Sequence, residues 1–246
     1  MKWRRSSQKG FTLLELLVAT AIFLVICAAM FGLLQVSQQK YASETQLSGS
    51  FQEARLGLDQ IVRDINMSGY PASSMFSNTS NPLSYAVAPF AWDPGYLTNT
   101  DCQIGSCFPT PSDHDLIVET DLGNGNGVSW IRYQLVGSIL LRGVVSPKTT
   151  GDPVSAFSGS GVMTPLVNNV VNNASQPIFV YTCYTPPPNG PQPCSSLSTN
   201  SPYNTPRYIG DVDITLIVKT PQQDLQTGAL KLIELTGRGH RTNSAN

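Results

Sequence analysis

Charged side chains are scarce in this chain. Asp, Glu, Lys and Arg make up 13% of its 246 residues, whereas they make up about a quarter of an average soluble domain. Ser, Thr, Asn, Gly and Pro take their place, a neutral polar composition that fits a protein outside the cytoplasm. The formal net charge is −1, so a generally basic surface for binding nucleic acid is not indicated.

Histidine is scarcer still, and no set of catalytic residues stands out. The only two histidines, His114 and His240, lie more than 120 positions apart, and neither has a Cys/His spacing that binds a metal. The chain has no Gly-x-Ser-x-Gly turn and no phosphate-binding glycine loop. We therefore expect no catalytic residue, no cofactor and no metal site, and we expect His114 to be a solvated loop residue.

One glycine-rich stretch has two interpretations. Residues 123–127 read Gly-Asn-Gly-Asn-Gly, which predicts a tight connection between two strands, because Gly and Asn accept a positive φ. Together with Asp121 the stretch leaves a calcium loop as the alternative, although it lacks the alternating acidic ligands and the closing Glu of an EF-hand.

What the chain does contain is one long apolar run near its amino terminus. Four Lys and Arg residues precede Gly10, and the 19 residues from 16 to 34 carry no charge. As an α-helix this run is roughly 28 Å long, enough to cross the core of a bilayer with its positive flank on the cytoplasmic side. Glu15 interrupts the apolar sequence. Because an unpaired carboxylate in a membrane costs on the order of a few kcal/mol, its presence suggests a function.

Residues 9–17 read Lys-Gly-Phe-Thr-Leu-Leu-Glu-Leu-Leu. This string resembles the class III signal of type IV prepilins and type II secretion pseudopilins, in which a short basic leader and a Gly precede Phe-Thr-Leu-Leu-Glu-Leu-Leu. The resemblance implies cleavage after Gly10 by a prepilin peptidase and N-methylation of the new terminus at Phe11. Glu15 would be the fifth residue of the mature chain.

The chemistry of this amino terminus indicates a role for Glu15 in assembly. Cleavage before Phe11 creates an ammonium group at the membrane boundary, and a carboxylate four residues on lies near the same face of a helix. In a filament, the partner of Glu15 would be the amine of the neighbouring subunit. Such a pair sets register, because misaligned subunits leave both charges unpaired.

Two other interpretations of the amino terminus stay open. A plain single-pass anchor would explain the apolar run, but neither the Gly10-Phe11 pair nor Glu15. A conventional secretory signal would have a shorter apolar core followed by a small-x-small cleavage site, whereas Ala19-Thr20-Ala21 lies inside the run.

The sequence predicts that one helix covers residues 11–68. Beyond the apolar run, apolar residues recur in steps of three and four and form a stripe that needs a partner, for which a β-sheet is the simplest choice; they are Leu47, Phe51, Ala54, Leu58, Ile61 and Ile65. Gly69, followed by Tyr70-Pro71, ends the helix. We therefore divide the chain into a leader peptide (1–10), a transmembrane helix (11–34), an amphipathic continuation (35–69) and a globular β-rich extracytoplasmic domain (70–246).

The domain after the helix is predicted from strand patterns at 115–120, 128–136, 139–145, 177–184, 208–220 and 229–236. Residues 71–112, 146–176 and 185–206 are rich in Pro, Ser, Asn and Gly and are expected to be irregular. The expected fold class is α+β: a long N-terminal membrane-spanning helix whose C-terminal half packs on an antiparallel β-sheet, as in pilins. Without the leader the chain would have 11 basic and 16 acidic residues, a formal charge of −5.

The five cysteines divide into one and four. Cys27 lies in the apolar run and is interpreted as a small buried apolar residue. The others form two close pairs, Cys102/Cys107 and Cys183/Cys194, which predict disulfides in an oxidising compartment. Of the three possible connectivities we favour the two local bridges, each contributing roughly 2–3 kcal/mol. A zinc site is the alternative, but ten residues separate the second pair, more than the usual spacing.

Two further regions resemble PilW-like minor pilins. Residues 63–70 (Arg-Asp-Ile-Asn-Met-Ser-Gly-Tyr) are similar to the Arg-Asp-Leu-Arg-x-Ala-Gly-Tyr end of the first helix in that group, with departures at Asn66 and Ser68; J-type minor pseudopilins have a similar Arg-Asp pair. Residues 115–118 (Asp-Leu-Ile-Val), 131–135 (Ile-Arg-Tyr-Gln-Leu) and 140–142 (Leu-Leu-Arg) resemble the hairpin core of the same group.

These observations predict a minor pilin or pseudopilin. It would sit in the bacterial inner membrane as a single-pass protein, be processed, and then join an extracellular or periplasmic filament. The expected partners are other minor and major pilins, the prepilin peptidase, the inner-membrane assembly platform and the membrane; no nucleic-acid partner is expected.

Three functional hypotheses follow. The first is a PilW-like minor pilin in the initiation and assembly of a type IV pilus, at or near the filament tip. The second is a J-type minor pseudopilin of type II protein secretion. The third is a DNA-uptake or adhesive pilin, suggested by the locally basic C-terminal end that contains Lys231, Arg238, His240 and Arg241.

Overall fold

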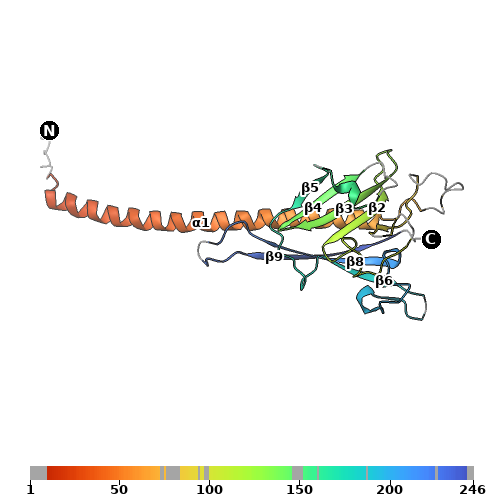
Figure 1. Ribbon diagram of the computed structural model, residues 1–246. Coiled ribbons are helices and arrows are strands. Elements are labelled where there is room, and N and C mark those ends of the chain that lie inside the picture. Colours follow the sequence, from red (N-terminus) through yellow and green to blue (C-terminus); the bar gives the residue numbers. More distant parts are fainter. Residues whose placement is uncertain are drawn as a thin grey trace, which may run out of the picture.

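The computed structural model describes residues 10–72, 75, 84–93, 95–96, 100–145, 152–159, 161–186, 188–224 and 227–242. It consists of one long helix, of which one end extends freely and the other is packed against two antiparallel sheets (Figure 1). The expected α+β, pilin-like fold is therefore confirmed.

Helix α1 (Leu13–Asn66) contains 54 residues without interruption. It begins after Thr12, whose side chain accepts a hydrogen bond from the Glu15 amide, and it is followed by Gly69 at a φ of 75°. The Gly69 amide donates to the Glu119 carbonyl over 2.8 Å, so the turn after the helix is hydrogen-bonded to the strand that contains Glu119. The helix is two residues shorter at each end than the range predicted from the sequence.

The first sheet contains five strands in the order β1-β2-β3-β4-β5, each antiparallel to its neighbour. They are β1 (Phe90–Ala91), β2 (Asp115–Asp121), β3 (Val128–Val136), β4 (Ile139–Val145) and β5 (Met163–Val167). A short 3-10 helix, η2 (Ser155–Phe157), covers part of one face, where Phe157 packs with Ala91, Ile117 and Trp130. Strand β2 is therefore buried along nearly its whole length.

The second sheet contains four strands in the order β7-β6-β8-β9. They are β6 (Phe179–Tyr184), β7 (Pro191–Pro193), β8 (Ile209–Lys219) and β9 (Leu232–His240). Two short 3-10 helices, η3 (Cys194–Ser196) and η4 (Pro206–Tyr208), lie in the connection between β7 and β8. Strands β8 and β9 pair antiparallel over nine residues, from Asp211 opposite His240 to Lys219 opposite Leu232.

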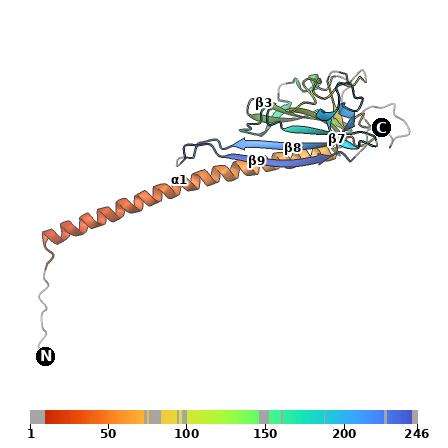
Figure 2. The ribbon, with the colours of Figure 1, turned by 90° about the horizontal axis from the view of Figure 1, so that it is seen from below.

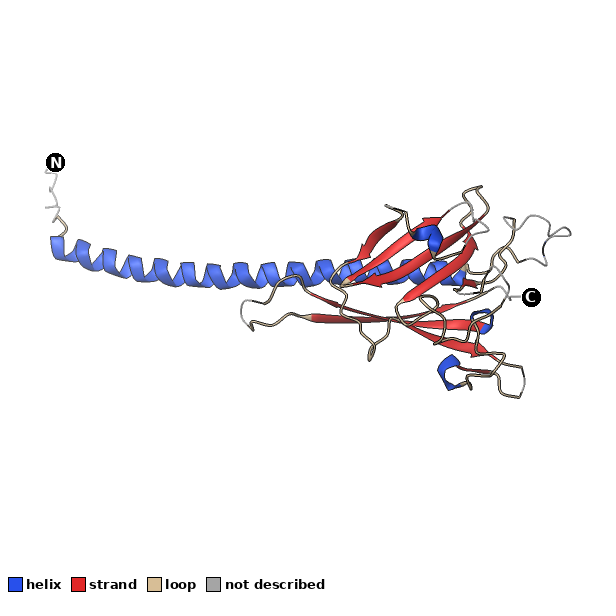
Figure 3. Ribbon diagram, in the orientation of Figure 1, coloured by secondary structure: helices blue, strands red, loops and turns tan. Residues whose placement is uncertain are grey.

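The main core lies where the C-terminal half of α1 meets both sheets (Figure 3). Ala54, Leu58, Ile61 and Ile65 are buried there, as the apolar stripe predicts. The stripe does not reach the core at its beginning, because Leu47 is only half-buried and Phe51 is 39% exposed.

Three strands lie in segments that the sequence analysis expected to be irregular. Strands β1 and β7 contain two and three residues, and β5 contains Pro165 at its centre. Their sequences do not alternate, so their conformation is set by pairing with longer neighbours rather than by local preference. The glycine-rich stretch 123–127 joins β2 to β3 as a hairpin connection, and the Asp121 carboxylate accepts from the Gly123 amide over 2.8 Å.

Candidate functional site

The residues singled out for processing lie at the exposed start of α1. Gly10 and Phe11 precede the helix, Phe11 is 88% exposed, and no atom lies within 4 Å of a Cβ built on Gly10. The Gly10–Phe11 bond therefore lies in an accessible stretch before the first helical turn, which is the arrangement a peptidase requires.

Glu15 folds back over this stretch in a capping box. Its Oε2 accepts hydrogen bonds from the Thr12 amide over 2.9 Å and from the Thr12 hydroxyl over 3.1 Å, and the Glu15 amide donates to the same hydroxyl. The reciprocal bonds satisfy donors that have no partner at a helix start. Among the described residues no partner is found for the other carboxylate oxygen, Oε1, so it is available to a group from outside the chain.

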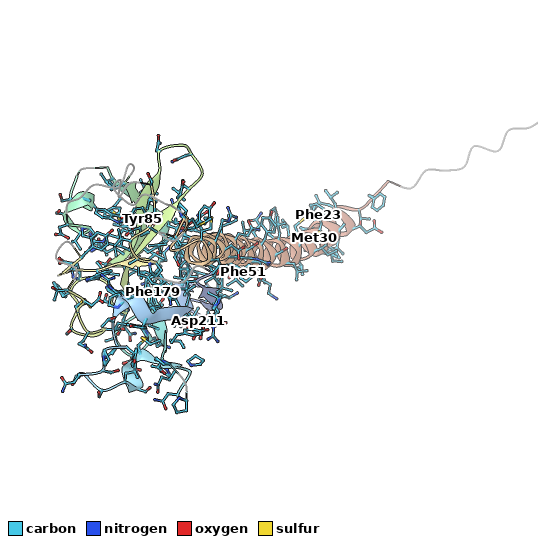
Figure 4. The ribbon with its side chains drawn as sticks, turned by 90° about the vertical axis from the view of Figure 1, so that its right-hand side faces the viewer. Phe23, Met30, Phe51, Tyr85, Phe179 and Asp211 are labelled. Atoms are coloured by element: carbon cyan, nitrogen blue, oxygen red, sulfur yellow. A yellow bond between two sulfur atoms is a disulfide. The ribbon has the colours of Figure 1, made fainter. Side chains whose placement is uncertain are left out.

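The first half of α1 is not covered by any other described part of the chain. Phe23 and Met30, both 64% exposed, project from the part that extends away from the sheets, whereas Phe51 lies near the domain (Figure 4). Of the helices in the described parts, α1 alone is long and apolar enough to cross a membrane. Cys27, interpreted as buried, is half-exposed and unbridged in the isolated molecule.

The second half of α1 is joined to the first sheet by a buried carboxylate. Asp64 is fully buried, and its Oδ2 accepts from the Tyr133 hydroxyl and from the guanidinium of Arg142 at 2.8 Å and 3.1 Å. Its Oδ1 accepts from Gln60 over 2.8 Å. Burial, reinforced by the neighbouring carboxylate, raises the pKa of Tyr133 well above its ordinary value, so the phenol keeps its proton and acts as a donor.

This cluster brings together the two regions that resemble PilW-like pilins. Asp64 comes from the Arg-Asp pair at the end of the helix, and Tyr133 and Arg142 come from strands β3 and β4. The sequence analysis did not predict their contact. A detectable signal was present, because Asp64 lies three residues after Ile61 and therefore on the apolar side of the helix.

A second buried ion pair fixes strands β2 and β3. The guanidinium of Arg132 donates to both carboxylate oxygens of Asp115, over 3.0 Å and 2.6 Å, and Gln134 donates to the same group over 3.1 Å. Burial raises the pKa of Asp115 in spite of these donors. Both clusters lie inside the domain, so they stabilise its packing rather than provide a site for catalysis.

The cysteines form the two local bridges favoured from the sequence. Cys102 is bonded to Cys107, and Cys183 to Cys194, with Cα atoms 5.3 Å and 5.0 Å apart. The second bridge joins β6 to the 3-10 helix η3. All four thiols are used in these bonds, so none is available as a zinc ligand.

The two histidines lie in different surroundings, and His114 departs from the expectation of a solvated loop residue. His114 is half-buried and lines a hollow of about 540 Å³ between residues 104–114 and β6, because the loop that carries it crosses the end of that strand. His240 belongs to β9, where its Nδ1 lies 2.5 Å from the Asp211 carboxylate.

Carboxylates also neutralise most of the locally basic C-terminal end. Arg238 donates to Asp211 over 2.7 Å, and Lys231 lies 3.3 Å from Asp224. Burial alone would raise the pKa of Asp211, but the hydrogen bonds from His240 and Arg238 outweigh it and the pKa lies below its ordinary value. The residues that suggested DNA binding are thus engaged within the domain.

The exposed amino-terminal segment, the uncovered apolar helix and the packed β-domain together fit a membrane-anchored protein of pilin-like architecture. Residues 5–31 match the family model described as the prokaryotic N-terminal methylation motif. The chain therefore carries a type IV prepilin-like class III signal, and its α+β fold is pilin-like. No curated protein and no solved structure matches the chain.

The motif has three general consequences. It indicates a structural protein rather than an enzyme, it indicates partners within a pilus assembly system, and it fits anchoring in a membrane through α1. Membership of the PilW-like group is a finer assignment and stays a prediction.

Proposed function

We propose that this chain is a minor pilin that takes part in the initiation and assembly of a type IV pilus. In this proposal the leader is removed after Gly10, Phe11 is N-methylated, and the mature chain passes from the bacterial inner membrane into a filament. The observation that carries the proposal is the division of α1 into a covered half, from Ala54 to Ile65, and an apolar half that no other described residues cover.

The uncovered half needs two different environments in succession. A bilayer satisfies its apolar surface while the subunit waits, and helices of neighbouring subunits can replace the lipid after assembly. Glu15 supports assembly with neighbouring subunits, since its Oε1 is available to the ammonium group of another subunit. Its partners would be other minor and major pilins, the prepilin peptidase and the inner-membrane assembly platform.

A position at or near the filament tip is inferred from the resemblance to PilW-like pilins. The Asp64 cluster supports the inference, because it shows that the separate segments carrying the resemblance form one packed unit. J-type pseudopilins share the Arg-Asp pair, so a tip component of type II secretion is the second candidate. The neutralised basic residues near β9 give less support to a DNA-uptake pilin.

The deciding experiment compares filaments and secretion in a deletion strain of the source bacterium. We expect loss of most surface filaments with normal release of exported proteins, and recovery of the filaments when the wild-type gene is supplied. Loss of secretion with normal filaments would instead identify a pseudopilin. Normal filaments together with normal secretion would contradict both assembly roles and leave adhesion or DNA uptake to be measured.

A further inference from the structure

Strand β9 is the long edge strand of the second sheet, and no strand of the described residues pairs with the side that faces away from β8. The order β7-β6-β8-β9 places it at the border of the second sheet, where it presents nine residues. The other border strands, β1, β5 and β7, are short or interrupted by proline. Long exposed edges invite pairing with another chain, and proteins usually shorten or cover them.

The direction of the β9 amide groups shows which of them can donate a hydrogen bond to another chain. The Arg241 amide donates to the Gly210 carbonyl and the Lys231 carbonyl accepts from the Thr220 amide, so the backbone amide groups of odd-numbered residues point toward β8. The backbone amide groups of even-numbered residues point away from the sheet. The outward amide of His240 is used by the Asn66 side chain over 2.8 Å, whereas no partner is found for those of Glu234 and Thr236 among the described residues.

An apolar groove of about 410 Å³ lies beside the start of this edge. Its walls are Glu44, Leu47, Ser48 and Phe51 of α1 and Leu232 and Ile233 of β9. Because Leu232 and Ile233 point to opposite faces of the sheet, a hollow that touches both lies at the free edge of the strand. Leu232 is 65% exposed, so the groove presents apolar surface next to the unpaired amides.

The charges around the groove favour a positively charged occupant. Glu234 is exposed and forms no ion pair among the described residues. Glu44 lies 3.6 Å from Lys231, which also contacts Asp224, and Lys219 lies opposite Leu232 in the sheet. The three carboxylates of Glu44, Asp224 and Glu234 therefore outnumber the two lysines.

We propose that the edge of β9 binds an extended segment of another polypeptide as an added β-strand. Main-chain bonds to Glu234 and Thr236 would hold the segment, an apolar side chain would fill the groove, and a Lys or Arg two residues away would lie beside Glu234. Strand addition with pockets for alternate side chains is an established mode of peptide recognition. The proposal goes beyond the pilin assignment and does not depend on it.

A second copy of this chain fits the same edge less well. Antiparallel pairing centred on Thr236 would place Glu234 opposite Arg238, but β9 runs along α1 (Figure 2), so the two apolar helices would point in opposite directions. They could not enter one membrane from the same side. Parallel pairing in register would bring the two Glu234 side chains together, which is unfavourable.

The test uses the full-length protein in detergent micelles and a labelled peptide of roughly eight residues, Thr-Lys-Thr-Leu-Thr-Lys-Thr-Val. A Lys lies two residues from the Leu on each side, so one of them can lie beside Glu234 whether the peptide binds parallel or antiparallel to β9. Fluorescence anisotropy measures binding, and hydrogen exchange follows the amides of the edge. We expect the peptide to bind and to slow exchange at Glu234 and Thr236. Thr236→Pro should weaken binding about tenfold, the loss of roughly one hydrogen bond, and Thr236→Ser should bind like the wild type.

Two further variants keep the test decisive if the proline variant does not fold. Glu234→Lys should weaken binding of this peptide, and a peptide N-methylated along its backbone should not bind the wild-type protein. The proposal is overturned if the wild type does not bind the peptide, or if the methylated peptide or the Thr236→Pro variant binds normally. A dimer that protects the same amides without peptide would overturn it in favour of a second copy.

Discussion

At the scale of single residues, Asp64 is the carboxylate through which the helix holds the first sheet. Asp64→Ala would leave the Arg142 guanidinium and the Tyr133 hydroxyl without their buried acceptor. We expect the free energy of unfolding to fall by roughly 3–5 kcal/mol, as when one partner of a buried ion pair is removed. Denaturation of the full-length protein in detergent, followed by tryptophan fluorescence, measures the change.

Asp59 provides the matched control for this prediction. It is an acidic residue of the same helix, but it is exposed, so Asp59→Ala should change the stability by no more than about 0.5 kcal/mol. Equal effects of the two substitutions would mean that the Asp64 cluster does not stabilise the contact between helix and sheet.

Processing also depends on single residues. Gly10→Val should block cleavage, because a branched side chain would not fit a peptidase that selects glycine before the cut. Mass spectrometry of the protein extracted from membranes should find Phe11 as the first residue of the wild type and the intact leader on the variant. A wild-type terminus elsewhere would show that residues 9–17 are not the processing signal.

At the scale of elements, two glycines of α1 should respond to the same substitution in opposite ways. A Cβ on Gly57 would collide with the Val167 side chain of β5, whereas a Cβ on Gly49 has no neighbour within 4 Å. Gly57→Ala should therefore destabilise the protein by about 1–3 kcal/mol. Gly49→Ala should leave stability unchanged or raise it by up to about 1 kcal/mol.

Thermal unfolding followed by circular dichroism would compare the two glycine variants with the wild type. A higher midpoint for Gly57→Ala would show that β5 does not pack against the helix as described.

The elements that the sequence predicted are those with strong periodic patterns. The long helix and strands such as β2, β3 and β4 have ends close to their predicted ones. Strand β9 was expected to end at 236, but it continues to His240 through Gly237 and Gly239. Glycine normally indicates the end of a strand, yet here it leaves room for Leu58 and Ile65 of the helix, a requirement of the tertiary fold that the strand sequence alone does not reveal.

The candidate site was predictable to different degrees along the chain. Gly10, Phe11 and Glu15 were identified from a local string, because their chemistry depends on neighbours in the sequence. Asp64, Tyr133 and Arg142 meet only after the helix has packed on the sheet, so no local pattern shows the contact. The open edge of β9 depends on the order of the strands, which their individual sequences do not specify.

At the scale of the whole molecule, the anchor and the domain should be separable by mutation. Glu15 contacts Thr12 and lies far along α1 from the buried cluster that begins at Ala54. Glu15→Ala should therefore leave insertion, cleavage and the unfolding of the domain unchanged, yet recruit neighbouring subunits poorly. The deletion strain complemented with this variant at matched expression should form few filaments, or secrete little if the protein is a pseudopilin.

The control for this experiment is Asp59→Asn, a change at an acidic residue that is exposed and lies away from the amino terminus. Full recovery of filaments or secretion with Glu15→Ala would show that the carboxylate has no role in assembly.

Because α1 continues unbroken from Leu13 to Asn66, it fixes the rotation of the domain about the helix axis relative to the membrane segment. Each residue of an α-helix turns the chain by about 100° and advances it by 1.5 Å. One residue inserted between 35 and 46 would therefore swing the whole domain by more than a quarter turn about the axis while lifting it only slightly. The length of this connecting stretch thus sets the direction in which the β9 edge faces, measured about the helix axis relative to the anchor, although none of its residues lies in that edge.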